Sequence, residues 1–204
     1  MLRRHAAKDR PLAIREIAFC QQHGLLGFEK SDEEAAALYE RAADLGDVEA
    51  MNELGLLYGD GALLDTTKAI AYLRMAADRG NARAQYNLGD CYADGDGVAR
   101  DDAEAFRFYK LAADQGFTQA EHYLGAFYAA GRGVARDFAE AFRWLERAAA
   151  KGHEDAKAHL AQLVAAREAG FAEAVGLLER AAAAGHAKAR ALLHLRAALD
   201  EVGP

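Results

Sequence analysis

The chain has almost no proline, since Pro11 and Pro204 are the only two among 204 residues. Proline interrupts helices because it lacks a backbone N–H and clashes with the preceding turn. Residues that favour strands are also scarce, with three isoleucines, six valines and three threonines in the whole chain. The interval between the prolines therefore lacks the strongest helix breaker and has few of the β-branched residues that favour sheets. These shortages predict an all-α protein whose helices end at glycine.

The chain also lacks a basic surplus and any long apolar run. Its formal net charge is −7, and binding to nucleic acid requires a basic surface that neutralises phosphates. No apolar run approaches the ~20 residues that span a membrane. The basic start at 1–10, which we expect to be flexible, has no apolar core of the kind found in secretory signals. We therefore expect no nucleic-acid partner, no membrane partner and a cytoplasmic location.

One segment occurs twice with few changes. "YADGDGVARDDAEAFRFYKLAADQG" at 92–116 returns 36 positions later as "YAAGRGVARDFAEAFRWLERAAAKG" at 128–152. Glycines that end this pattern recur at spacings of 34, 36, 36 and 33 residues, namely Gly46, Gly80, Gly116, Gly152 and Gly185. Self-similarity at such a period predicts stacked helical hairpins, because one hairpin cannot bury its apolar faces alone.

The first helix of each hairpin, helix A, carries Ala-x3-Leu-Gly-x2-Tyr, as at 84–92. A glycine inside a helix costs about 1 kcal/mol relative to alanine. Three copies of this glycine indicate that a neighbouring group needs the space beside helix A. They are Gly55, Gly89 and Gly125.

The second helix, helix B, carries an alanine eleven positions and a large apolar residue eight positions before the closing glycine. Trp144 is one of these large residues and is expected in the core. The A–B loop reads Gly-x-Gly-Val-Ala-Arg-Asp at 95–101 and 131–137, and Asp101 and Asp137 are expected to cap helix B. The predicted helices are 11–23 and 32–45, 48–59 and 66–79, 82–94 and 102–115, 118–130 and 138–151, and 154–168 and 171–184.

These helices define one predicted array over 11–201. Its repeats are 11–46, 47–80, 81–116, 117–152 and 153–185, followed by a capping helix at 186–201. The terminal units deviate most from the pattern, as expected of units that cover only one neighbour.

The helix A pattern, together with Ala105-x3-Tyr109-x2-Ala112 in helix B, resembles the tetratricopeptide repeat. The longer Gly-x-Gly-Val-x2-Asp loop and the Ala-Ala-x2-Gly end of helix B are closer to a sister family. In both features the chain resembles Sel1-like repeat proteins over about 11–190. The resemblance implies a right-handed α-solenoid of about five repeats that acts as a non-catalytic adaptor for a protein or peptide partner, without a cofactor.

The resemblance also implies where a partner would bind. In the related tetratricopeptide geometry the A helices line a concave groove, with exposed positions on either side of Leu-Gly. Transferred by register, these candidate groove residues are Arg15, Phe19, Gln22, Asn52, Leu56, Tyr86, Asp90, His122, Ala126, Ala158 and Gln162. We interpret the groove as a site for a peptide or a partner helix. The alternative is that these side chains pack inside a tightly coiled array.

No other pattern indicates chemistry. Cys20 and Cys91 occupy equivalent positions two repeats apart, which places them over ~15 Å apart and beyond the ~7 Å reach of a disulfide. Both are expected as core residues. The seven histidines show no ligand spacing, and His153 is expected in a turn before a helix. We therefore predict no enzyme and no metal. Two alternatives stay open: a hydrolase acting on an amide, as suggested for some secreted relatives, and a structural homodimer.

Overall fold

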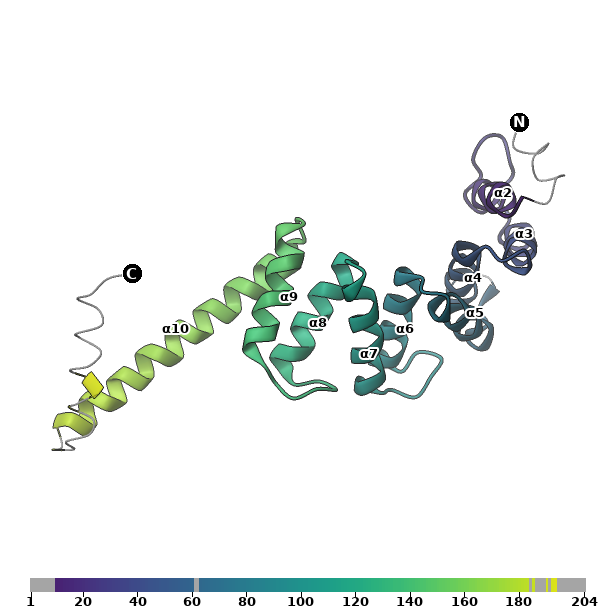
Figure 1. Cartoon of the computed structure of the whole chain (residues 1–204). Helices are drawn as coiled ribbons and strands as arrows, with labels where there is room; N and C mark the ends of the chain where they lie inside the picture. Colours follow the sequence, from purple (N-terminus) through teal and green to yellow (C-terminus); the bar gives the residue numbers. More distant parts are fainter. Residues whose placement is uncertain (1–9, 61–62, 184, 186–189, 191, 194–204) are drawn as a thin grey trace. The chain divides into compact units, whose positions relative to one another are not determined.

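The computed structural model describes residues 10–60, 63–183, 185, 190 and 192–193. Every regular element among these residues is an α-helix, which confirms the predicted all-α solenoid (Figure 1). The helices are α2 (Pro11–His23), α3 (Asp32–Asp44), α4 (Val48–Gly59), α5 (Thr66–Asp78), α6 (Ala82–Asp94), α7 (Asp102–Asp114), α8 (Thr118–Ala130), α9 (Phe138–Ala150) and α10 (Glu154–Ala183).

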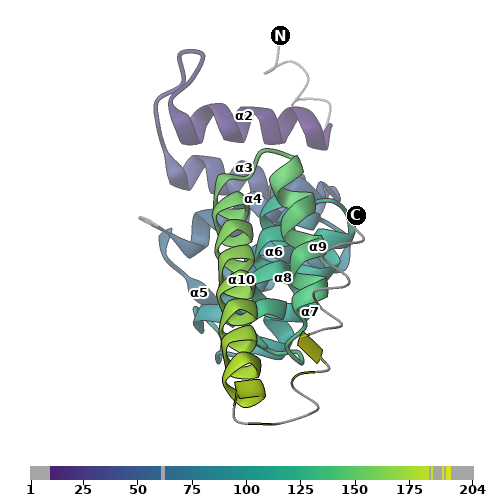
Figure 2. The same ribbon diagram turned by 90° about the vertical axis from the view of Figure 1, so that its left-hand side faces the viewer.

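Helices α2 to α9 form four A–B hairpins, and each helix agrees with its predicted range to within one residue. Figure 2 shows the first hairpin, α2 and α3, with the loop between them at one end. The glycines that end the predicted repeats all have φ between 83° and 94°, in the left-handed region where glycine is favoured. These glycines therefore mark where the B helices α3, α5, α7 and α9 end.

The fifth hairpin was predicted wrongly. Instead of two helices at 154–168 and 171–184, α10 runs without a break from Glu154 to Ala183. The stretch around Gly170 has no Gly-x-Gly loop, and Gly170 keeps a helical backbone. One glycine inside a helix costs only about 1 kcal/mol and does not by itself end the helix.

The chain divides into two compact units, 1–156 and 157–204. The four hairpins belong to the first unit, and the following subsections concern mainly this unit. The single array over 11–201 stays a prediction for the second unit. Residues 1–9 and most of the predicted cap at 186–201 lie outside the described residues.

The helix A glycines let helix B approach closely. A Cβ atom added at Gly55, Gly89 or Gly125 would lie 2.5–2.7 Å from a side chain of the paired helix B. Those side chains are all buried and belong to Leu73, Tyr109 and Leu145. The predicted need for space beside helix A is thus confirmed, and the neighbour is a large residue of the same hairpin.

The A–B loops also pack against the preceding hairpin. A Cβ at Gly97 would touch Thr66 and Ile70 in the preceding helix B, and one at Gly133 would overlap the Asp102 carbonyl. The second glycine of each loop therefore lies over the first turn of the preceding helix B. At its end, the loop aspartate caps the next helix as predicted: the Asp101 carboxylate accepts from the backbone N–H groups of Ala103 and Glu104, and Asp137 does the same in α9.

Hydropathy agrees with the packing. Among the described helices, none has the combination of length and apolar character that spanning a membrane would require.

The close approach at Gly89 leads to a stability prediction. Alanine would normally stabilise a helix by about 1 kcal/mol relative to glycine. Here its Cβ would lie 2.6 Å from the ring of Tyr109, which is buried and has little room to move. Because overpacking costs about 1–3 kcal/mol, we expect Gly89→Ala to lower the free energy of unfolding by about 1 kcal/mol, measured by urea denaturation.

Gly59 provides the matched control in another A helix. A Cβ there would make an ordinary contact of 3.8 Å with Ala69. Gly59→Ala should therefore leave the free energy of unfolding unchanged or raise it. Equal stabilisation by both substitutions would contradict the packing described for Gly89.

Candidate functional site

Two positions on each A helix of the first unit are left at least partly uncovered by the neighbouring helices. They lie one residue before and two residues after the helix A leucine, or Ile17 in α2, and together we call them the A face. Its members are exposed or half-buried: Glu16, Phe19, Glu53, Leu56, Asn87, Asp90, Tyr123 and Ala126. The A face is therefore the surface that the A helices of the first unit offer to a partner.

The structure divides the predicted groove residues. The residues located two positions after the leucine lie on the A face: Phe19, Leu56, Asp90 and Ala126. The residues located two positions before it lie where one A helix packs against the next, which we call the seam: Arg15, Asn52, Tyr86 and His122. The exposure expected for Asn52 and His122 was wrong, because only 0% and 8% of their surfaces are accessible. The remaining predicted residues are Gln22, half-buried on α2, and Ala158 and Gln162, exposed on α10 in the second unit.

Contacts across the seam explain this burial. The Arg15 guanidinium donates to the Asp47 carboxylate at the start of α4, with an Nη1–Oδ1 distance of 3.0 Å. The Asn87 amide donates to Asn52 Oδ1 at 3.1 Å. The rings of His122 and His153 have centroids 4.8 Å apart, and His153 accepts from the Ala156 N–H at the start of α10, as predicted for a turn residue. The seam residues thus hold successive A helices together.

Sequence reasoning missed two further buried polar side chains, at Gln85 and Glu121. They stand where Ile14 and Met51 stand in the first two repeats, and this polar substitution at an apolar position was the available signal. Glu121 forms salt bridges of 2.8 Å with both Arg147 and Lys151.

Gln85 likewise has partners within the fold. Its amide donates to the Ala77 carbonyl, and its oxygen accepts from Gln115 at 2.7 Å. The partners of both side chains lie on neighbouring helices or directly after them, so Gln85 and Glu121 hold the helices together.

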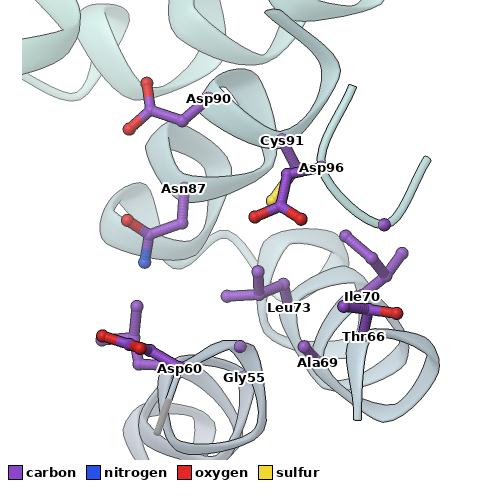
Figure 3. A pocket seen from close by; sticks show the side chains of 13 residues that line it. Gly55, Asp60, Thr66, Ala69, Ile70, Leu73, Asn87, Asp90, Cys91 and Asp96 are labelled. Atoms are coloured by element: carbon purple, nitrogen blue, oxygen red, sulfur yellow. The ribbon is translucent and has the colours of Figure 1, made fainter. Parts of the chain in front are cut away.

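A cavity of about 220 Å³ opens between the second and third repeats, and we call it the 2–3 cavity (Figure 3). Apolar side chains of α4 and α5 form one part of its lining, including Leu56, Ile70 and Leu73. Asn87, Asp90 and Cys91 of α6 form another part, and the following loop contributes Asp96 and Gly97. With Asp60, the lining holds three carboxylates and no basic residue.

A second cavity, of about 480 Å³, is lined by residues of the first three repeats. Two predicted groove residues, Arg15 and Phe19, line it. Glutamates and one further arginine complete its charged lining, and Tyr39 also contributes: Glu16, Glu49, Glu53 and Arg83. Both cavities therefore contain A-face residues, but only the 2–3 cavity has charges of a single sign.

Asp90 is held in place at the edge of an aromatic cluster. The Tyr109 hydroxyl donates to Asp90 Oδ1 at 2.7 Å, and the Tyr86 hydroxyl also donates to this carboxylate. Burial raises the pKa of Asp90 above its ordinary value, although both hydrogen bonds act in the opposite direction. The rings of Tyr86, Tyr109 and Tyr123 have centroids 5.2–6.0 Å apart. The carboxylate thus has a fixed orientation at the 2–3 cavity.

The two cysteines are free thiols, as predicted, and Cys20 is buried. Cys91 is half-buried and lines the 2–3 cavity, so it is only partly a core residue. Its pKa is raised to about 11, first because burial disfavours the thiolate and then because the Asp96 and Asp90 carboxylates repel it. Within the described part of the chain, no group of three or more His, Cys, Asp or Glu side chains could hold a metal ion.

Comparison with known proteins agrees with this architecture. The chain is 32% identical to the crystal structure of c5321, a protective antigen of uropathogenic Escherichia coli that displays an SLR fold, with a TM-score of 0.75 over 79% of this chain and 35% of that one. A Sel1 repeat protein from Oxalobacter formigenes is 34% identical, with a TM-score of 0.72 over 79% of this chain and 47% of that one.

A curated relative matches a shorter stretch. DAP3-binding cell death enhancer 1 of Rattus norvegicus is 41% identical over 66 residues, which are 32% of this chain and 13% of the relative. This chain thus spans only a small part of that protein.

The family model for the Sel1 repeat matches the chain in five segments: 11–47, 48–81, 82–117, 118–153 and 169–186. The first four segments coincide with the four hairpins, and the fifth lies largely within α10. The repeat pattern, the hairpin stack and these matches together show that the chain belongs to the Sel1 repeat family.

Proposed function

We propose that this chain is a non-catalytic scaffold that binds a peptide or a partner helix on its A face. Sel1 repeat proteins are in general protein-interaction scaffolds. The observation that carries the proposal is the contrast between two kinds of position. The alanine, leucine and glycine positions that pack inside each hairpin hold nearly the same residues in all four hairpins, whereas the A face changes from Glu and Phe to Glu and Leu, Asn and Asp, and Tyr and Ala.

Packing explains why this contrast points to binding. The inner positions are fixed by the need to fill the space between hairpins, and Leu54, Leu88 and Leu124 are all buried there. The exposed members of the A face contribute less to the stack, so they are available to recognise a partner. Phe19, Leu56 and Tyr123 keep 43%, 41% and 37% of their surface exposed and would serve as apolar anchors.

The charge of the A face favours a basic partner. Three of its eight members are carboxylates, Glu16, Glu53 and Asp90, and none is a lysine or arginine. This distribution agrees in sign with the net charge of the chain. Complementary charge raises association rates and suppresses wrong partners more than it raises affinity.

The state of Cys91 supports a non-catalytic role. Nucleophilic cysteines have a lowered pKa, because the thiolate is the reactive form. The pKa of Cys91 is instead raised to about 11, so its thiol is protonated at neutral pH. Asp90, which lines the same cavity, accepts hydrogen bonds from two tyrosines.

The reactivity of Cys91 tests this point. A thiol with a pKa near 11 has about a hundredfold less thiolate at pH 8 than an unperturbed cysteine. We therefore expect iodoacetamide to alkylate Cys91 in the folded chain at least about a hundredfold more slowly than in the guanidinium-unfolded chain. Peptide mass spectrometry would follow the two cysteines separately. A rate in the folded chain equal to or above that of the unfolded chain would contradict the non-catalytic assignment.

Binding to the A face is tested with a peptide library displayed on phage. Peptides selected against the immobilised chain should lose about tenfold or more in affinity when Phe19, Leu56 and Tyr123 are all replaced by alanine, since exposed anchors carry much of the binding energy. Isothermal titration calorimetry would measure the dissociation constants, and circular dichroism would verify that the variant keeps its helicity.

The B helices offer a matched control. Met75, Leu111 and Phe138 lie on α5, α7 and α9 and expose 38%, 40% and 50% of their surface. Their triple replacement by alanine should leave peptide affinity within about twofold of the wild type. Failure to enrich any peptide, or a loss confined to the B-helix variant, would refute the proposed site.

A further inference from the structure

The 2–3 cavity has a counterpart in the next repeat, between α6–α7 and α8. The third and fourth repeats are offset by 36 residues, so Cys91 corresponds to Phe127 and Asp96 corresponds to Arg132. On the facing side, Thr66 at the start of α5 corresponds to Asp102 at the start of α7. Three positions of the cavity lining thus hold different residues one repeat later.

In the counterpart, the chain's own Arg132 fills the space. Its guanidinium lies 4.4 Å from the centre of the Phe127 ring, and its Nη2 donates to Asp102 Oδ1 at 2.6 Å. The pKa of Asp102 is lowered to about 2, mainly because Arg132 donates to it.

A third contact of Arg132 places it at the position of the cavity. Nη2 also lies 3.4 Å from the carbonyl oxygen of Ala93. Ala93 corresponds to Gly59, which lines the 2–3 cavity. Every group that Arg132 contacts therefore has its equivalent in the wall of the 2–3 cavity.

The 2–3 cavity lacks this internal arginine. The loop supplies Asp96 at the equivalent position, and Cys91 takes up less room than phenylalanine. Figure 3 shows the side chains of Asp96, Cys91 and Leu73 around the cavity. No salt bridge of the described residues involves any of its three aspartates: Asp60, Asp90 and Asp96.

We infer that the 2–3 cavity binds an arginine side chain of the partner polypeptide, in the position that Arg132 occupies one repeat further on. This inference rests on the scaffold function proposed above and specifies the partner's chemistry. A guanidinium presents five donors in a rigid fork, which suits several acceptors around one cavity. The aliphatic stem would pack against Leu56 and Leu73.

Size and charge support an arginine over other occupants. At about 220 Å³ the cavity is smaller than the ~300–1,000 Å³ usual for drug-sized ligands and suits a single side chain. Its lining carries three carboxylates and no cation. Burial is the main cause of the raised Cys91 pKa, and the negative charges of Asp96 and Asp90 add to it.

The test uses N-acetyl-arginine N-methylamide as a probe, with its citrulline analogue as the neutral isostere. Titration of the ¹⁵N-labelled chain should shift the backbone amides of Leu56, Cys91 and Gly97 saturably with the arginine probe. The citrulline probe should bind at least about tenfold more weakly, because its neutral ureido group carries no positive charge to pair with the carboxylates.

Matched variants locate the site. Asp96→Asn should weaken the arginine probe about tenfold or more. Asp94→Asn removes the same charge from an exposed residue of α6 that does not line the cavity and should change affinity less than about twofold. Asp96→Arg places an arginine at the position equivalent to Arg132 and should abolish probe binding, with retained helicity showing that the chain is folded.

Several results would overturn the inference: equal binding of the citrulline probe, equal losses in Asp94→Asn and Asp96→Asn, or undiminished binding to Asp96→Arg. The library peptides separate this failure from that of the scaffold. If arginine-to-citrulline changes in those peptides have no effect while the A-face variant still loses binding, the arginine site is wrong and the scaffold stands. If the probe binds but no peptide does, the cavity takes a free guanidinium compound and the partner-polypeptide inference is wrong.

Discussion

The close contact between the two helices of each hairpin is the constraint on which the rest of the structure depends. Helix A has glycine, and therefore no side chain, at Gly55, Gly89 and Gly125. A large residue of helix B fills each of these spaces. The compact hairpin that results still has apolar faces that only another hairpin can cover. The seam between A helices and the loop glycines over the preceding helix B then fix how the hairpins stack. The A face and its cavities follow from this stacking.

Much of the fold could be predicted from sequence because its signals are local. Glycines such as Gly80 and Gly116 end helices through backbone conformation, and aspartates such as Asp101 begin them through a hydrogen bond three residues away, so neither depends on distant contacts. The predicted helix break at Gly170 was wrong because these local signals are missing there. A glycine without its loop and cap is a weak break, and the helix continues through it.

The candidate site could be predicted only in part, because it depends on the phase of each helix and on volume. A shift of one position turns a side chain by about 100° around a helix, which is the difference between buried Asn52 and half-buried Glu53. Periodicity marks the buried face but does not say which flank meets the next repeat. The 2–3 cavity was missed because it arises from a difference in size between Cys91 and Phe127. The sequence shows that Asp96 replaces Arg132 at the equivalent position. The consequence, a cavity without an internal arginine, could be inferred only from the contacts that Arg132 makes in the structure.

The central claim is that each hairpin is stable only through its neighbours, and repeat deletion tests it most directly. The free energy of unfolding in urea, followed by circular dichroism, would be compared for fragments 82–117, 82–153 and 48–153, which hold one, two and three hairpins. The account predicts that the single hairpin is largely unfolded and that stability and its urea dependence rise with each added repeat. A folded single hairpin, or equal stability for all three fragments, would contradict it.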